Sequence, residues 1–198
     1  MVAEAPEFSA RVLQTLRQPL ESGEVVLHRA HGAVRYPARF QLVLAANPCP
    51  CGRFHGSGAG CTCTPLERRR YLSRLSGPLL DRVDLQIGVL PVRLRSDEPG
   101  ESTAEVAQRV RRARSRAAAR LADSGLSVNA EAPGRWLRHH TPRSACRPVW
   151  SALDRGLVSA RGADRALRVA WTLADLDDQD SPDVAHVEQA LLLRRSAS

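Results

Sequence analysis

The sequence contains no lysine, and several kinds of segment are also missing from it. Because all 29 basic residues are arginine, the phosphate-binding motif G-x-x-x-x-G-K-[ST] cannot occur in this chain. No run approaches the roughly 18 apolar residues of a membrane-spanning helix, and the N-terminus lacks the basic and apolar stretches of a signal peptide. No internal repeat or long low-complexity tract occurs. These absences predict a cytoplasmic protein without membrane contact.

The length of 198 residues is enough for one domain of ordinary size, or for one domain and a small second one. The formal net charge of +8 points to a polyanionic partner such as nucleic acid. Uniform arginine use, with abundant alanine, glycine and proline, also fits GC-rich coding. The charge therefore makes nucleic acid plausible without establishing it.

The first half of the sequence mixes helical and strand patterns. Apolar residues at helical spacing after a proline predict a helix over 6–20, and alternation with a turn near 30–32 predicts a hairpin over 24–37. The apolar run 39–47 predicts a buried strand, and 83–92 a further strand. Between them, 65–77 predicts a short helix stopped by Gly77-Pro78. We therefore expect an α/β domain over residues 1–95.

The second half of the sequence is predicted to be all-helical. Ser102 and Glu105 can form a capping box that begins a helix, with a glycine at 125 near its end. Its expected apolar stripe consists of Val106, Val110, Ala113, Ala117 and Leu121. Further helices are expected near 143–155, 159–176 and 182–195, the last with Ser181 as its N-cap. Residues 96–198 are therefore expected to form a helical domain.

Two close cysteine pairs, Cys49-x-Cys51 and Cys61-x-Cys63, flank a glycine-rich loop. Four thiolates gathered in this way can hold a tetrahedral Zn²⁺, whereas stable disulfides are disfavoured in a cytosolic protein. His55 is an alternative for one of the four ligands. The spacing differs from C-x2-C, so free thiols in a surface loop remain the competing interpretation of this 49–63 segment. The fifth cysteine, at 146, stands alone in a helical segment and is expected to be buried or idle.

Several segments in order carry a resemblance that covers nearly the whole chain. They are EAPEFSARVLQTLRQPLESGEV, FQLVLAANPCPCG, CTCTP, RYLSRLSGPLLDRVDL and SARGADRALRVAWTLADL. Together they resemble the C-terminal half of the magnesium-chelatase-like AAA+ ATPases, the YifB/ComM group. The resemblance implies an α/β nucleotide-binding core of the P-loop NTPase type, followed by a helical lid domain. It also implies ATP and Mg²⁺ as cofactors, a hexameric ring, and ATP-driven DNA branch migration in natural transformation.

The resemblance assigns roles to four residues in the ATPase site. Glu4 matches the catalytic glutamate that polarises the attacking water, and Asn47 the sensor asparagine near the γ-phosphate. Arg82 matches the arginine finger that reaches a neighbouring subunit, and Arg161 the sensor arginine of the lid. Each residue also has a competing interpretation. Glu4 would be a frayed terminal carboxylate and Asn47 a turn asparagine. Arg82 would form an ion pair with the neighbouring Asp81 or Asp84, and Arg161 would be a surface arginine at a helix start.

The resemblance also places the hairpin at the loop that projects toward the ring channel. Its candidate DNA-contacting residues are His28, Arg29, His31 and Arg35, with a solvated polar hairpin as the alternative. Two positions depart from the family pattern. Ala3 stands where the family has the Mg²⁺-binding aspartate, and Trp171 stands where the family commonly has arginine. We therefore expect no chemistry at residue 171.

The missing phosphate loop and aspartate suggest that the chain begins inside the ATPase core. On this interpretation the chain alone neither binds ATP well nor hydrolyses it, and it acts with a missing N-terminal half, in a longer product or as a separate subunit. The alternatives are a non-enzymatic remnant or zinc-stabilised interaction module and, disfavoured by the double cysteine pair, a magnesium chelatase subunit of tetrapyrrole synthesis. The sequence leaves these functions open.

Overall fold

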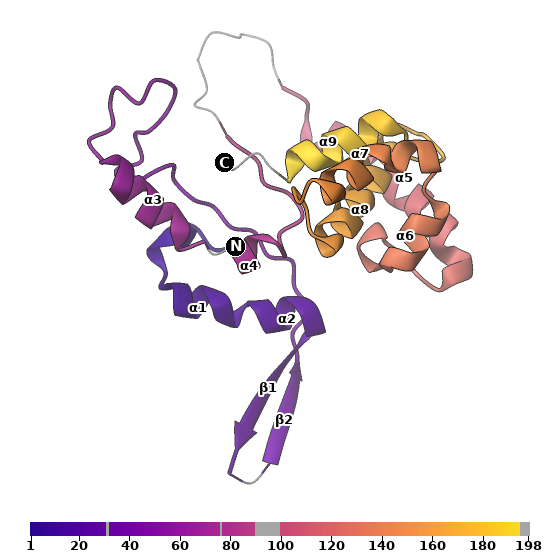
Figure 1. Cartoon of the computed structure of the whole chain (residues 1–198). Coiled ribbons are helices and arrows are strands. Elements are labelled where there is room, and N and C mark those ends of the chain that lie inside the picture. The colour runs from indigo at the N-terminus through magenta and orange to yellow at the C-terminus, as the bar shows by residue number, and fades with distance from the viewer. Residues whose placement is uncertain (31, 76, 90–99, 195–198) are drawn as a thin grey trace. The chain divides into compact units, whose positions relative to one another are not determined.

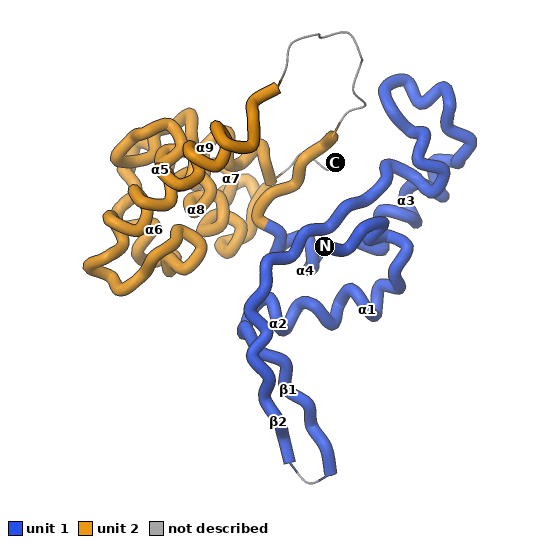
Figure 2. Tube along the Cα trace, turned by 180° about the vertical axis from the view of Figure 1, so that it is seen from behind, with its two compact units in different colours: residues 1–83 blue, residues 84–198 orange. Residues whose placement is uncertain are grey.

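The computed structural model of the chain describes residues 1–30, 32–75, 77–89 and 100–194. These residues form two compact units, Met1–Val83 and Asp84–Ser198 (Figure 2). Unit 1 contains a two-stranded sheet and short helices, whereas the regular elements described in unit 2 are all helices (Figure 1). The predicted mixture of helices and strands is thus confirmed, whereas an AAA+ core and a boundary near residue 95 stay predictions.

Unit 1 begins with three short helical segments instead of the single helix predicted over 6–20. These are η1 (Ala5–Glu7), α1 (Ala10–Thr15) and α2 (Arg17–Ser22). Pro19 explains the break, because its nitrogen carries no hydrogen to donate to the carbonyl of Thr15, where α1 ends. The side chain buried from α1 is Leu13, whereas Val12 of the predicted apolar face is 52% exposed.

The hairpin is confirmed, with strands β1 (Glu24–Arg29) and β2 (Gly32–Pro37) paired antiparallel. Its register pairs Val25 with Tyr36 and Leu27 with Val34. Every residue of β2 is exposed, as are the last three residues of β1. Figures 1 and 2 show the hairpin extending from the end of α2 away from the other elements of unit 1. No described element of the unit therefore covers its outer part.

The buried strand predicted over 39–47 is wrong. Among the described residues, the only strand-like pairing of this segment is an isolated parallel bridge between Val2 and Leu44. The Val2 amide donates to the Val43 carbonyl at 2.8 Å, and the Ala45 amide donates to the Val2 carbonyl at 3.0 Å. Because the pairing is so short and no described element covers the outer face, Phe40 and Val43 remain largely exposed.

The cysteine segment leads into α3 (Pro65–Ser73), which is followed by α4 (Gly77–Leu80). Gly77-Pro78, predicted to stop a helix over 65–77, instead begins α4, because proline is tolerated in a first helical turn. A Thr64–Glu67 capping box begins α3. The strand predicted over 83–92 is not formed by its described residues, and 90–92 lie outside the described residues.

Unit 2 contains α5 (Thr103–Leu121), α6 (Gly134–His140), α7 (Arg143–Asp154), α8 (Ala160–Leu176) and α9 (Val184–Leu193), with short turns η2 (Ala122–Ser124) and η3 (Asn129–Glu131). The Ser102–Glu105 capping box is confirmed, whereas α6 was not predicted. The predicted N-cap Ser181 is wrong. Asp183 caps α9 instead, because its carboxylate accepts the His186 amide at 2.9 Å.

The core of unit 2 is built around α8. Alanines recur along its buried side, and their small side chains let α5, α7 and α9 approach closely. Cys146, on α7, is buried in this core, as expected from its lone position. Among the described residues, no helix has both the length and the apolar character needed to cross a bilayer.

Candidate functional site

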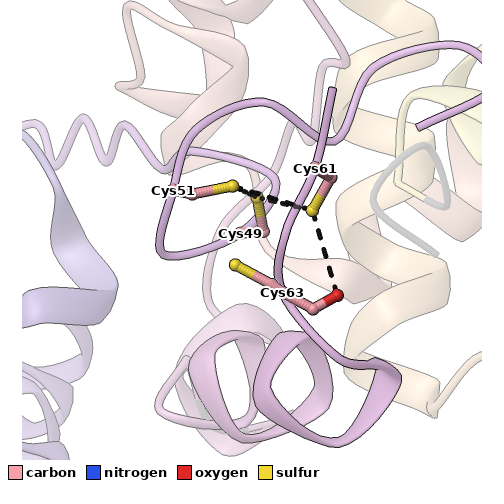
Figure 3. Close-up of side chains that lie close together, drawn as sticks. All are labelled: Cys49, Cys51, Cys61 and Cys63. Carbon is pink, nitrogen blue, oxygen red and sulfur yellow. Dashed lines mark hydrogen bonds between the residues drawn. The ribbon is translucent and has the colours of Figure 1, made fainter. Parts of the chain in front are cut away.

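The four paired cysteines come together in unit 1. The sulfur atoms of these residues all lie within 4.8 Å of one another; the residues are Cys49, Cys51, Cys61 and Cys63. Cys49 Sγ lies 3.4 Å from Cys51 Sγ and 3.7 Å from Cys61 Sγ, and the Cys51 and Cys61 sulfurs are also 3.7 Å apart. Figure 3 shows these side chains converging from two stretches of the loop. The structure therefore brings the four predicted cysteines together, while their binding of zinc stays a prediction.

The loop backbone holds the cysteines in place through a series of turns. The Gly52 amide donates to the Cys49 carbonyl at 3.0 Å, and the Cys61 amide donates to the Gly58 carbonyl at 2.9 Å. Gly58 adopts φ +71°, and a Cβ there would press on the Phe54 ring, so glycine is required. Arg68 of α3 lies 3.9 Å from the centre of that ring and donates to the Cys63 carbonyl at 3.1 Å. The loop is thus tied to α3 at both of its arms.

The pKa values of two thiols in the cluster, Cys51 and Cys63, are shifted in opposite directions. The backbone N–H of Arg53, then that of Thr62 and the Cys49 thiol, stabilise a thiolate at Cys51 and lower its pKa to about 5. At Cys63 a backbone hydrogen bond from Cys51 favours the thiolate, but burial and the neighbouring thiols outweigh it and raise the pKa to about 12. The cluster therefore disfavours two adjacent negative charges when no cation is bound.

This donor set fits Zn²⁺. Zinc–sulfur bonds of about 2.3 Å in a tetrahedron require sulfur atoms about 3.8 Å apart, close to the 3.4–3.7 Å measured here. His55, the alternative ligand, does not belong to the group, so the four candidate ligands are all cysteines. In the described part of the chain, no other group of histidine, cysteine or carboxylate side chains is gathered as a candidate metal site.

Glu4 and Asn47 lie at the same end of the short parallel pairing in unit 1. Glu4 follows Val2, and Asn47 follows Ala45, whose carbonyl accepts the Ala5 amide at 2.8 Å. Both side chains are exposed and accessible to a ligand. Glu4 has φ 52° in the left-handed region, which strains a residue with a Cβ. The structure thus brings these two predicted residues toward one edge, while their catalytic roles stay predictions.

Tyr71 of α3 is a neighbour of this edge that the sequence did not single out. Burial raises the pKa of its hydroxyl, and the Glu7 and Glu4 carboxylates contribute, whereas a hydrogen bond from the Asn47 backbone opposes the shift. The Cys49 sulfur is also close enough to affect its pKa. Tyr71 therefore lies near both the Asn47 turn and the cysteine cluster. No local spacing signals this contact, because the residues come from separate segments.

Arg82 is paired in a way that the sequence did not indicate. Its Nη2 donates to the Glu21 carboxylate of α2, and its Nη1 donates to the Pro78 carbonyl at 2.6 Å. The side chain is only 10% exposed. The expected alternative partner Asp84 instead accepts a hydrogen bond from Arg165 at 2.7 Å. To reach a neighbouring nucleotide, Arg82 would have to leave Glu21.

Arg161 is exposed in the first turn of α8, where Ser159 caps the helix. It belongs to unit 2, whereas the other three predicted nucleotide residues belong to unit 1. Trp171, in the same helix, is 3% exposed, and its Nε1 donates to Thr141 Oγ1 at 3.0 Å. This core position is consistent with the expectation that residue 171 carries no chemistry.

The candidate DNA-contacting side chains of the hairpin are divided between its two faces. His28 pairs with Ala33, and Arg35 pairs with Val26, so His28 and Arg35 share one face. Arg29 lies on the opposite face with Leu27, and His31 lies outside the described residues. Arg35 forms an exposed ion pair with Glu24, and such a pair stabilises the fold little.

Two family models and several known proteins match this sequence. The family model "Magnesium chelatase, subunit ChlI" matches residues 1–96, and "Magnesium chelatase, subunit ChlI C-terminal" matches residues 100–194. An uncharacterized protein of Mycobacterium tuberculosis is 50% identical over an alignment of 199 positions that covers 98% of this chain and 39% of that protein. YifB of Escherichia coli is 40% identical over 203 residues, covering 96% of this chain and 38% of YifB.

Competence protein ComM of Haemophilus influenzae is 38% identical over 192 residues, covering 95% of this chain and 37% of ComM. The chain thus spans about two-fifths of the length of these relatives. Both family models and the relatives match it over nearly its whole length. The chain therefore belongs to the magnesium-chelatase-like family that includes YifB and ComM.

Proposed function

We propose that this chain is part of an ATP-driven DNA-processing motor of the ComM type. The observation that carries the proposal is the match of competence protein ComM over 95% of the chain, with both family models in the same order. The net charge of +8 and the exposed basic hairpin support a DNA partner. The motor is proposed to work as a ring of six subunits in the cytoplasm.

In this proposal four residues of the chain act on ATP. Glu4 orients and polarises the attacking water, and Asn47 positions it next to the γ-phosphate. Arg82 stabilises the transition-state charge in a neighbouring subunit, and Arg161 contacts the nucleotide from the helical unit. The exposure of Glu4 and Asn47 at one edge fits the first two roles. When bound, Mg²⁺ would neutralise phosphate charge, but Ala3 offers it no ligand from the side chain.

The sequence contains no lysine, so the chain supplies no phosphate-loop lysine of its own. We therefore propose that it hydrolyses ATP only together with a segment that carries this loop. The Glu21–Arg82 ion pair holds the finger in an inactive position until that segment and a neighbouring subunit are present. Zn²⁺ bound by the four cysteines has a structural role, because it holds the Asn47 turn against α3.

The first test is the affinity of the chain alone for ATP with Mg²⁺, measured by titration calorimetry. We expect no binding in the micromolar range, and micromolar affinity would contradict the requirement for a second segment. The second test uses a chimera in which this chain replaces the matching part of the Mycobacterium tuberculosis relative. We expect ATPase activity that DNA stimulates.

Substitutions in the chimera distinguish the finger from its ion pair. Arg82→Ala is expected to lower the ATPase rate about a thousandfold, because it removes transition-state charge stabilisation. Glu21→Gln breaks the same ion pair but keeps the arginine, so it should preserve or raise activity. Arg114→Ala, on the exposed side of α5, serves as the matched control and should have no effect. Equal losses in Arg82→Ala and Glu21→Gln would assign Arg82 a purely structural role.

A zinc-stabilised interaction module without ATPase activity is the second candidate. The gathered cysteine sulfurs and the ion pair that holds Arg82 are the observations that favour it. An inactive but folded chimera that still binds zinc would support this candidate over the motor. Magnesium chelatase activity in tetrapyrrole synthesis is disfavoured by the double cysteine pair.

A further inference from the structure

Helices α6 and α7 of unit 2, joined by Thr141-Pro142, form a strongly basic segment. From Ala132 to Leu153 the sequence contains no aspartate or glutamate. The same stretch carries six exposed arginine and histidine side chains: Arg135, Arg138, His139, His140, Arg143 and Arg147. We call these six residues the α6–α7 basic surface. None of them was assigned a role from the sequence.

Most of the positive charge on this surface is not neutralised by the protein. Arg138 forms an ion pair with Asp164, which packs against the start of α6 from α8. For Arg135, Arg143 and Arg147, no carboxylate partner occurs among the described residues. Just before α5, Glu101 pairs with Arg109, but Arg111, Arg112 and Arg114 further along this helix are exposed and likewise have no carboxylate partner among the described residues. Both surfaces therefore attract anions, and the α6–α7 basic surface differs in the aromatic pair that lies among its charges.

An aromatic pair lies within the same surface. The rings of Trp136 and His140 are stacked, with centroids 4.1 Å apart and planes 16° from parallel. The His140 ring is further held because its Nδ1 lies 2.8 Å from the Trp136 carbonyl oxygen. Trp136 in turn packs on the buried Trp171, with ring centroids 5.5 Å apart. His140 is thus an exposed ring supported from the core of unit 2.

We propose that the α6–α7 basic surface binds single-stranded nucleic acid. Unpaired arginines attract the phosphate backbone, and an exposed, supported ring offers a stacking surface to an unpaired base. An acidic protein segment would use the arginines but would leave the ring without a matching partner. The surface lies in unit 2, whereas the hairpin of the proposed motor lies in unit 1. The proposal deepens the DNA-processing function but is tested separately from it.

The test measures binding of the full chain to a fluorescein-labelled dT oligonucleotide by fluorescence anisotropy at several salt concentrations. The variant Arg135→Gln/Arg143→Gln/Arg147→Gln removes three phosphate contacts. We expect its salt slope, log K against log[salt], to be shallower by about 2, because each lost contact with a single strand changes the slope by about 0.7.

The matched control is Arg111→Gln/Arg112→Gln/Arg114→Gln on α5, which removes the same number of positive charges and should leave most of the salt slope. Equal changes in the two variants, or an unchanged slope in the α6–α7 variant, would overturn the proposal. If the α6–α7 variant instead lowers only self-association, measured by analytical ultracentrifugation, the surface belongs to a protein contact and the proposal is wrong.

The stacking ring is tested with His140→Ala and His140→Phe. We expect the alanine variant to bind dT about tenfold more weakly and the phenylalanine variant to bind normally, since phenylalanine retains a ring for stacking. Circular dichroism melting identifies variants that fail to fold. Normal binding by a folded His140→Ala would overturn the assignment to single strands. If Arg29→Gln in the hairpin abolishes binding while the α6–α7 variants bind normally, the hairpin is the binding site and the proposal is wrong.

Discussion

Breaking the buried ion pair between Arg120 and Asp175 is expected to destabilise unit 2 strongly, because it leaves a buried charge without its partner. Arg120 Nη1 and Nη2 donate to the two carboxylate oxygens of Asp175 at 2.6 and 2.8 Å. Asn129 also contacts both partners, at 2.9 Å each. The Asp175 side chain is 1% exposed, and the Arg120 guanidinium lies 4.3 Å from the centre of the Trp171 ring. Solvent therefore screens this pair very little.

Arg120→Met removes the cation and leaves the Asp175 carboxylate buried, with Asn129 still able to donate to it. Breaking a buried pair in this way costs about 3–5 kcal/mol. This is a large part of the roughly 5–15 kcal/mol by which a typical domain is stable. Arg114→Met, on the exposed side of the same helix, should cost less than about 0.5 kcal/mol. The contrast separates loss of the buried pair from loss of an arginine on α5.

The assay is urea unfolding followed by tryptophan fluorescence. All three tryptophans, Trp136, Trp150 and Trp171, lie in unit 2, so the signal reports this unit alone. Adding Asp175→Asn to Arg120→Met should restore more than half of the lost free energy of unfolding, because a neutral amide replaces the unpaired charge. The reasoning is refuted if Arg120→Met lies within about 1 kcal/mol of the parent, or if Asp175→Asn lowers the double variant further.

Three further predictions concern separate parts of the chain. The protein purified from zinc-containing medium should hold about one Zn²⁺ per chain by plasma mass spectrometry, and Cys49→Ser should lower that content; a zinc-free, folded parent would contradict the site. Burial raises the pKa of Cys146, so at pH 8 this thiol should resist iodoacetamide in the folded protein and react in urea; equal rates would contradict its burial. Gly134→Ala should cost about 1–3 kcal/mol, because a Cβ would overlap the Asp164 carboxylate; Asp164→Ala should remove most of that cost in thermal melts.

Local signals predicted the elements whose stability depends on nearby residues. The hairpin was predictable because alternation and a turn lie within fourteen residues, and the Ser102–Glu105 capping box because its partners are three residues apart. The prediction of one helix over 6–20 was wrong because Pro19 removes a backbone donor. Proline is a local signal, but the prediction gave more weight to the apolar periodicity. The strand over 39–47 failed because burial depends on what covers a strand, which its own residues do not specify.

The candidate site divides in the same way. Close pairs of cysteines predicted a cluster of four sulfurs, because the chain between them is short and rich in glycine. The predicted partners of Arg82 were its neighbours in sequence, but the structure pairs it with Glu21, 61 residues away. Tyr71 beside Asn47, and the stacked Trp136 and His140 above Trp171, likewise depend on packing between segments.

The sequence by itself determined the absence of a phosphate-loop lysine, the cysteine spacing, the helical character of the second half and the family resemblance. These features are carried by residue identity and by short-range spacing, which survive without knowledge of contacts. Only the tertiary structure decided which arginines are neutralised and which remain available to an anion. Arg120 and Arg135 are indistinguishable as letters, but one is buried against Asp175 and the other is exposed on α6. That difference arises because long-range packing, and not the side chain itself, sets the environment of each charge.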